Sequence, residues 1–287
     1  MHPVLEQIDP LSFTTVRLQT LYNDQHLSNA TGFFYGGFFD GKPNIWLATN
    51  WHVLAGRHTS PPHNAMHSKG AIPNRVRLNL ILKANQPEYT PGGPPVLLKE
   101  HFIDLYNQGG LAFWYQHAQG PVFDVAVLNL HPLIETCEMR GINHVALNND
   151  MAIQIGNQIF ILGYPLGFQH FAETPIWKAG VIASEPNQET HESRNRVVID
   201  ATTRQGMSGS PVIMRQKTHY ISEQGDIVAE ANATRFIGIY SSRPDIAVAT
   251  DINDEDRRAE IGFFYKSGCV YDAIMRGIRG PRFGELP

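Results

Sequence analysis

The stretch VVIDATTRQGMSGSPVI, residues 197–213, decides how the rest of the chain is interpreted. It joins two short apolar runs through a polar segment in which Gly206 and Gly209 lie close to Ser208. Glycine adopts backbone dihedrals that a residue with a Cβ resists. The segment is therefore either an ordinary turn between two strands or a turn that presents one hydroxyl and two N–H groups to a ligand.

Apolar runs of strand length recur along the chain and end at turn residues, of which there are 25 glycines and 19 prolines among 287 residues. These runs include NIWLATNWHVL, RVRLNLIL, DVAVLNL, QIFILGYP, RFIGIYSS and EIGFFY. Many short strands with frequent turns predict an all-β sandwich or barrel. The exception is CVYDAIMRGI (269–278), where apolar residues four positions apart predict a short C-terminal helix.

The length of the chain allows two small domains or one large one. We expect a division near residues 136–152, between the DVAVLNL run and the QIFILGYP run. This predicts an N-terminal β subdomain over residues 1–140. A C-terminal β subdomain, which includes the helix, then spans residues 141–287.

The composition argues against several classes of partner. A net charge of -4 and a pI near 6.3 give no electrostatic reason to expect nucleic acid or a membrane surface. The first residues lack the basic and apolar regions of a secretory signal, and no apolar run approaches the ~18–20 residues of a membrane span. Cys137 and Cys269 form neither a disulfide framework nor a metal motif, so we expect a reducing compartment and a cytoplasmic protein.

Three polar residues lie beside apolar runs, in the order His52, Asp124 and Ser208. A serine hydroxyl is a weak nucleophile unless a base with a pKa near neutrality, such as histidine, takes its proton. That histidine needs a buried carboxylate to fix its tautomer and to stabilise its cation. Backbone N–H groups, here those of Gly206 and Ser208, can stabilise the oxyanion that forms.

Each of these residues alone also has a structural explanation. A GxSG tetrapeptide commonly forms a turn, an isolated histidine is commonly half-buried and hydrogen-bonded, and an aspartate can simply begin a strand. The joint occurrence in this order favours nucleophilic catalysis.

His58, His63 and His67 could bind zinc if they were helical, but no carboxylate or cysteine is near them and we expect a polar loop. We predict no metal and no cofactor.

In these motifs the chain resembles the trypsin-like, chymotrypsin-fold serine peptidases of the bacterial type, in particular the Deg/HtrA-like and glutamyl-endopeptidase-like proteases. The resemblance is carried, in the family's order, by NATGFFY, IWLATNWHVLAG, FDVAVLNL, ILGYPLG, KAGVIASEP, VVIDATTRQGMSGSPVI and RFIGIYSSR. It implies two packed six-stranded antiparallel β-barrels. It also implies a serine endopeptidase with His52 as general base, Asp124 as its orienting partner and Ser208 as nucleophile, and with the N–H groups of Gly206 and Ser208 as oxyanion hole.

The resemblance further implies a set of substrate-binding residues: Thr202, Thr203, Tyr240, Ser241, Ser242, Arg243, Gly262 and Phe264. No aspartate lies at the base of this pocket, where Thr202 is expected, so a preference for Lys or Arg is not expected. Thr203 fits the threonine of glutamyl-specific relatives, but Tyr240 stands where they have a histidine. A small or apolar substrate side chain is the favoured interpretation. An acidic side chain is the alternative, because Arg243 could bind it. The backbone of residues 241–243 is expected to pair with a polypeptide substrate as an added strand.

Three departures from the family pattern bear on regulation. Met207 stands where members activated by cleavage have an acidic residue that pairs with the freed N-terminal amine. Ser210 replaces the usual glycine, and the segment between His52 and Asp124 is long. The first departure indicates an activating protein partner or, as an alternative function, a catalytically latent module that binds peptides or acts as a scaffold. The acidic stretch 251–260 is expected to be a solvated loop.

Overall fold

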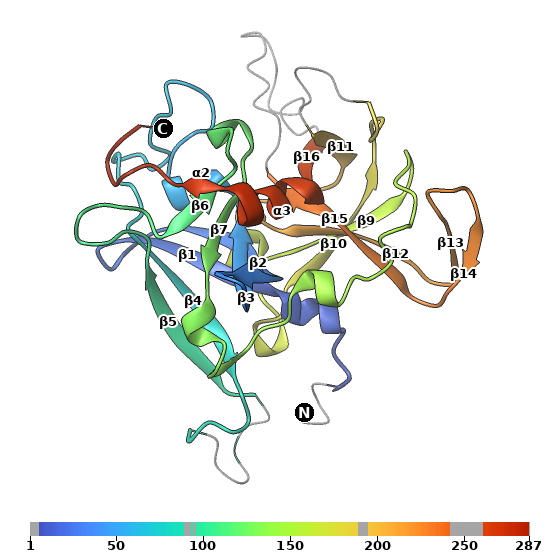
Figure 1. The fold of residues 1–287 in the computed structure, drawn as a ribbon, viewed down its shortest axis with the longest axis horizontal. Helices are drawn as coiled ribbons and strands as arrows, with labels where there is room; N and C mark the ends of the chain where they lie inside the picture. Colours follow the sequence, from blue (N-terminus) through green and yellow to red (C-terminus); the bar gives the residue numbers. More distant parts are fainter. Residues whose placement is uncertain (1–5, 89–92, 94–95, 189–194, 242–260, 287) are drawn as a thin grey trace.

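Residues 6–88, 93, 96–188, 195–241 and 261–286 are described by the computed structural model (Figure 1). Ser242, Arg243 and the acidic stretch 251–260 lie outside these residues. The structure is built mainly of antiparallel strands that form one large sheet and one closed barrel. The prediction of an all-β fold is confirmed.

The first half of the chain, together with β17 from the C-terminal tail, forms a nine-stranded sheet with the order β17-β6-β7-β3-β2-β1-β4-β5, in which β8 pairs with β4. This half has more strands than the six expected, partly because the C-terminal tail adds β17 to β6 and because β8 adds to β4. Alternate residues of β4 are buried, as expected for a strand with one face on a core. The strands are β1 (Thr15–Tyr22), β2 (Gln25–Phe39), β3 (Lys42–Thr49), β4 (Arg75–Leu82), β5 (Leu98–Asp104), β6 (Trp114–Gln116), β7 (Ala126–Asn129), β8 (Cys137–Glu138) and β17 (Ile278–Arg279).

The second half forms a closed barrel with the order β10-β11-β16-β15-β12-β9, which confirms the six-stranded barrel expected there. A separate hairpin, β13 with β14, extends from the barrel at the right of Figure 1. The strands are β9 (Gln158–Gly163), β10 (Ile176–Ile182), β11 (Arg196–Asp200), β12 (Pro211–Gln216), β13 (His219–Ile221), β14 (Ile227–Ala229), β15 (Ala233–Tyr240) and β16 (Ile261–Lys266).

The predicted C-terminal helix is α3 (Ser267–Arg276), and it crosses the junction between sheet and barrel (Figure 1). Val270 and Ala273 on its inner face are buried in a cluster that receives side chains from both halves. Trp46 and Val127 of the sheet and Ile213, Ile239 and Tyr265 of the barrel belong to this cluster. One apolar core therefore joins the two halves.

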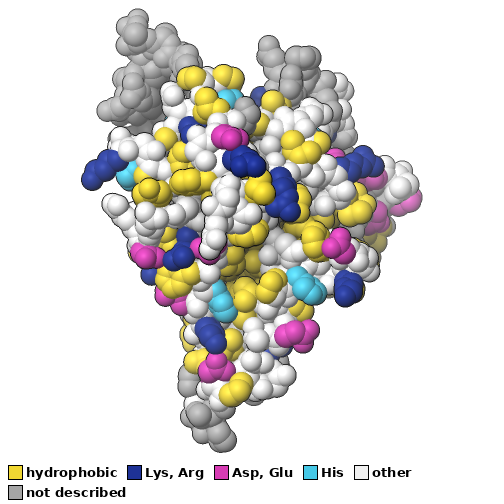
Figure 2. Space-filling model, turned by 60° about the vertical axis from the view of Figure 1, so that its left-hand side comes forward, with side chains coloured by type: hydrophobic (Ala, Val, Ile, Leu, Met, Phe, Trp, Pro, Cys, Tyr) yellow, Lys and Arg dark blue, Asp and Glu magenta, His cyan; other side chains and the backbone are white. Residues whose placement is uncertain are grey.

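Short 3-10 segments occupy several connections: Pro10–Thr14, Gly120–Val122, His131–Leu133, Ile142–His144, Pro165–Gly167 and Phe171–Glu173. Within the described residues, none of the helices has the length and apolar character that crossing a membrane requires. On the face drawn in Figure 2, basic and acidic side chains are interspersed among hydrophobic ones.

Candidate active site

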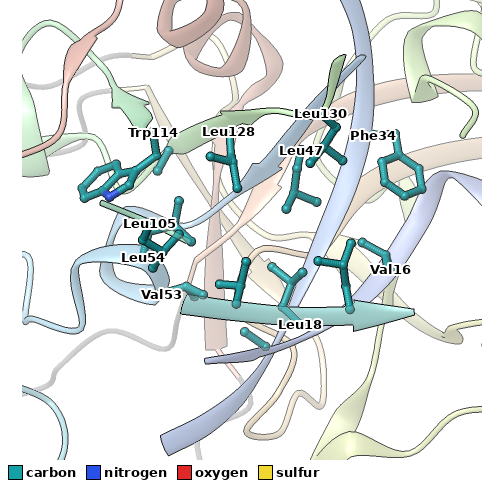
Figure 3. Packing of buried hydrophobic residues seen from close by; sticks show 14 of the residues in the cluster. Val16, Leu18, Phe34, Leu47, Val53, Leu54, Leu105, Trp114, Leu128 and Leu130 are labelled. Atoms are coloured by element: carbon teal, nitrogen blue, oxygen red, sulfur yellow. The ribbon is translucent and has the colours of Figure 1, made fainter. Parts of the chain in front are cut away.

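His52 lies in α2, a short helix (Trp51–Ala55) that follows β3 almost directly. The helix ends at Gly56, whose φ of +64° is the left-handed conformation that favours glycine. Val53 and Leu54 are buried, and Figure 3 shows them beside Leu105 in the core of the sheet. Because these neighbours hold the helix against the core, the half-buried His52 imidazole has a defined position.

Asp124 holds His52 through both oxygens of its carboxylate. One oxygen, Oδ1, accepts the backbone N–H of His52 at 2.9 Å, and Oδ2 lies 2.7 Å from the ring Nδ1. Asp124 is only 2% exposed, although it precedes β7 in a connecting segment. This is the arrangement that directs the other ring nitrogen, Nε2, away from the carboxylate.

The electrostatics of the pair favour a charged Asp124. Burial raises the pKa of this carboxyl, but the charge of His52 and the hydrogen bonds from His52 and Ser241 outweigh that effect and leave the pKa below its usual value. The Ser241 hydroxyl donates to Oδ2 over 2.5 Å. The side-chain amide of Asn50 donates to the backbone carbonyl of Asp124 at 2.8 Å, which fixes the segment that carries the carboxylate.

Ser208 lies in the turn between β11 and β12, where the backbone takes two left-handed conformations. Gly206 has φ +95° and Gly209 has φ +85°. A Cβ on Gly206 would lie 2.3 Å from the carbonyl oxygen of Tyr164, and one on Gly209 would lie 2.1 Å from the carbonyl oxygen of Thr31. Neither position therefore tolerates a side chain without movement of the surrounding backbone.

Thr31 of β2 holds the turn from the opposite half of the molecule. Its hydroxyl donates to the carbonyl of Gly206 at 2.7 Å, and its N–H donates to the carbonyl of Ser208 at 2.9 Å. Among the backbone hydrogen bonds of the described residues, the N–H groups of Gly206 and Ser208 have no acceptor. Two donors are thus left beside the Ser208 hydroxyl.

His52 and Ser208 line the same pocket, whose volume is about 300 Å³. Gly206 also lines it, so these three residues border a common space. No direct hydrogen bond joins the two side chains in the part of the chain described, and such contacts are commonly long when no ligand is bound. The three residues expected from the sequence are therefore brought together at the junction of sheet and barrel.

Residues 30–219 match the family model described as a trypsin-like peptidase domain. The chain belongs to the trypsin-like peptidases. The family expected from the motifs is confirmed, and with it the chymotrypsin-like fold.

Solved structures similar to this trypsin-like peptidase include HtrA-type and Deg proteases. The HtrA-type protease AlgW with a tripeptide is 15% identical, with a TM-score of 0.46, over 92% of this chain and 59% of that chain. The Rv3671c protease from M. tuberculosis H37Rv in an inactive form is 16% identical, with a TM-score of 0.43, over 95% of this chain and 91% of that chain. Deg5 is 15% identical, with a TM-score of 0.42, over 80% of both chains. No curated protein matches this peptidase.

The residues expected at the base of the peptidase's primary pocket lie on β15, β16 and the segment after β11. The hydroxyls of Thr203 and Tyr240 are 2.6 Å apart and both residues are buried. Gly262 makes room for the Tyr240 ring, because a Cβ there would lie 2.9 Å from its Cε2. Thr202 is half-buried, whereas Phe264 is fully buried in the core of the barrel.

Met207 and the loop histidines have structural surroundings of their own. The Met207 side chain is fully buried in the barrel core, so the position of the family's activating acid is filled by an apolar contact. His63 Nδ1 lies 3.0 Å from the carbonyl oxygen of His58, and His67 Nδ1 accepts the backbone N–H of Lys69 at 3.3 Å.

Two residues that hold the site were missed from the sequence in this role. Ser241 was expected to act through its backbone, yet its hydroxyl donates to Asp124. Thr31 was not singled out, although it fixes two carbonyls of the Ser208 turn. No local motif marks either residue, because each contacts a partner that is more than a hundred positions away.

Proposed function

We propose that this protein is a serine endopeptidase that cleaves polypeptides through an acyl-enzyme. The observation that carries the proposal is the hydrogen-bonded Asp124–His52 pair, whose histidine lines the same pocket as Ser208 and Gly206. Membership of the trypsin-like peptidases supports it independently.

In this mechanism the Ser208 Oγ attacks the carbonyl carbon of the scissile bond while His52 takes the hydroxyl proton. Asp124 stabilises the imidazolium that forms, and the N–H groups of Gly206 and Ser208 stabilise the oxyanion. The intermediate collapses as the C–N bond breaks and His52 protonates the leaving amine. Water then attacks the acyl-enzyme with the same base, which releases the carboxylic acid and restores Ser208.

The acyl side of the substrate is proposed to pair with the backbone that follows β15, beginning at Ser241. Main-chain hydrogen bonds would supply affinity there, and the pocket base of Thr203 and Tyr240 would accept a small or apolar side chain. We further propose that the protein acts in a reducing compartment, because the number and spacing of its two cysteines, Cys137 and Cys269, fit neither a disulfide framework nor a metal motif.

The experiment that tests this function is labelling with a fluorophosphonate probe together with cleavage of a peptide library. Ser208→Ala is expected to abolish labelling and to lower turnover by several orders of magnitude without unfolding the protein. Ser210→Ala is the matched control, because this neighbouring serine is fully buried and its hydroxyl has no hydrogen-bond partner among the residues that the structure describes. Equal cleavage by the wild type and by Ser208→Ala would contradict the proposal.

The alternative function is a catalytically latent module that binds peptides. It is favoured by one observation, the buried Met207 side chain at the position of the family's activating acid. Labelling only after a protein partner is added would support an activated peptidase. A chain that binds peptides yet resists the probe under every condition would support the latent module.

A further inference from the structure

The pocket that contains His52 and Ser208 has a second wall, which the proposed mechanism does not use. This wall comes from β2 and from the segment between α2 and β4. Among the residues that line this side of the pocket are Leu27, Val53, Met66, His67, Ala71 and Pro73. With a volume of about 300 Å³, it lies at the lower end of the range of ligand clefts.

The segment after α2, residues 56–73, is a folded wall held by its own contacts. The backbone N–H of Met66 donates to the carbonyl of Gly56 at 2.9 Å, and Arg57 forms an antiparallel bridge with Ala65. The Arg57 guanidinium also donates to the carbonyl of His63 at 3.1 Å. Pro73 closes the far end against Gly56, where a Cβ would lie 2.2 Å from the proline Cδ.

This wall combines apolar side chains with small polar ones and with His67. None of the residues lining the pocket is Asp, Glu, Lys or Arg. Leu27, Val53, Ala71 and Pro73 supply apolar surface, and the Met66 side chain is 48% exposed at the rim. An exposed methionine beside a cavity offers a polarizable apolar surface that adapts to different partners.

The position of the pocket indicates which part of a substrate it receives. Tyr240 and Ser241, at the end of β15 where the acyl side is proposed to pair, do not line it, and neither does Thr203. His52 does line it, with the Asp124 carboxylate bound on its Nδ1 side. Because the histidine protonates the leaving amine, the residues that follow the scissile bond leave along the side of His52 that faces the pocket.

We propose that this pocket binds the first residues after the scissile bond and that the protein selects an apolar, uncharged side chain there. The inference rests on the proposed peptidase function and names part of its substrate class. It assigns Met66 and the 56–73 segment as determinants of specificity on the leaving-group side.

The test uses two kinds of substrate with one common acyl side. In the first, a peptide library varies the residues after the scissile bond. In the second, a chromogenic amide replaces all of those residues. The wild type is expected to cleave peptides with Leu or Met after the scissile bond at least about tenfold better in kcat/KM than peptides with Asp or Glu. Met66→Asp is expected to remove most of this preference and to change peptide cleavage more than hydrolysis of the chromogenic amide.

Met275→Asp is the matched control, because Met275 is 52% exposed on α3 and does not line the pocket. A flat profile after the scissile bond, with normal hydrolysis of the chromogenic amide, would overturn this inference and leave the proposed function standing. An equal loss of both activities in Met66→Asp, with the fold retained, would also overturn it. Failure of the wild type on both substrates, with no labelling of Ser208, would remove the peptidase function and this inference together.

Discussion

The nine-stranded sheet and the closed barrel hold their parts of the candidate site by different means. The sheet positions His52 and Asp124 mainly through side-chain hydrogen bonds around a buried carboxylate. The barrel positions Ser208 through backbone conformation, with Gly206 and Gly209 both at positive φ. Contacts from the opposite half complete each part, since Ser241 of the barrel side bonds Asp124 and Thr31 of the sheet bonds the Ser208 turn.

Because side-chain hydrogen bonds hold one half of the site and backbone conformation holds the other, the two halves should tolerate different substitutions. Around Asp124, a change of functional group at constant shape should be harmful, because the hydrogen bonds define the arrangement. Around Ser208, the addition of a single methyl group should be harmful, because the turn excludes a Cβ.

Asp124→Asn changes the functional group at nearly constant shape in the sheet half. We expect kcat on a peptide substrate to fall about 10⁴-fold, because an amide stabilises the wrong imidazole tautomer and no cation. Steady-state kinetics at neutral pH measure this. Asp104→Asn is the control, since its carboxylate is exposed and pairs with Arg75 at the surface. A loss smaller than tenfold at Asp124 would mean that side-chain chemistry does not define this half.

Gly206→Ala adds one methyl group in the barrel half. We expect kcat to fall by roughly 10²–10³, because the turn must shift and its N–H leaves the oxyanion position. Gly225→Ala is a closely matched control: its φ is +92°, near the +95° of Gly206, but a Cβ there meets no atom within 4 Å. Similar activity losses in the two variants would show that backbone strain alone, without the oxyanion site, explains the effect.

Ser241→Ala removes the contact from the barrel side to the carboxylate. We expect kcat/KM to fall about tenfold, since a hydrogen bond to a charged group contributes roughly 1.5–3 kcal/mol. The pKa of Asp124 is held below its usual value partly by this bond, so its loss raises the pKa. Because catalysis needs the ionised carboxylate, the acid limb of the pH–rate profile should lie at higher pH in Ser241→Ala than in the wild type. A pH–rate profile measures this shift, and Ser241→Thr, which keeps a hydroxyl, should restore it. An unshifted acid limb in Ser241→Ala would argue against the contact.

Two buried tyrosines of the barrel half bind the sheet half, and they should make stability fall in alkali. The Tyr164 hydroxyl lies 3.1 Å from the carbonyl oxygen of Thr15 and 2.8 Å from that of Glu173, and the Tyr265 hydroxyl donates to the carbonyl of Val122 at 3.0 Å. Burial raises the pKa of both groups. Above the ordinary tyrosine pKa of about 10, the unfolded chain ionises while the folded chain does not, so the free energy of unfolding falls as pH rises.

Tyr265→Phe should cost about 1 kcal/mol near neutral pH and should make the alkaline decline shallower. Urea unfolding at several pH values measures both effects. Tyr22→Phe is the control, because the Tyr22 side chain is exposed and is expected to change neither quantity. An alkaline slope in Tyr265→Phe as steep as in the wild type would show that this tyrosine ionises in the folded protein.

The candidate site was predictable to the extent that its residues belong to local motifs. His52, Asp124 and Ser208 each stand next to an apolar run, and the structure places His52 and Ser208 on one pocket and Asp124 against His52. The roles of Ser241 and Thr31 were not predictable, since a serine or threonine in a strand pattern has no local feature that names a distant partner. The pocket wall formed by residues 56–73 was expected only as a polar loop, because its apolar surface depends on how Met66 folds back onto Gly56.

By itself the sequence determined the β-rich character of this protein, its C-terminal helix and its family, because these depend on short-range periodicity and on motifs in a definite order. The tertiary structure alone decided that nine strands share one sheet, that Met207 fills the barrel core, and that Met66 borders the pocket of His52. These features arise from pairing and packing between segments far apart in the chain, and such contacts leave little trace in the pattern of either segment. The segment QGMSGSPVI is a further example. Its glycines predict a turn from the sequence, but the position of that turn in the protein depends on contacts with the hydroxyl of Thr31 and the carbonyl of Tyr164.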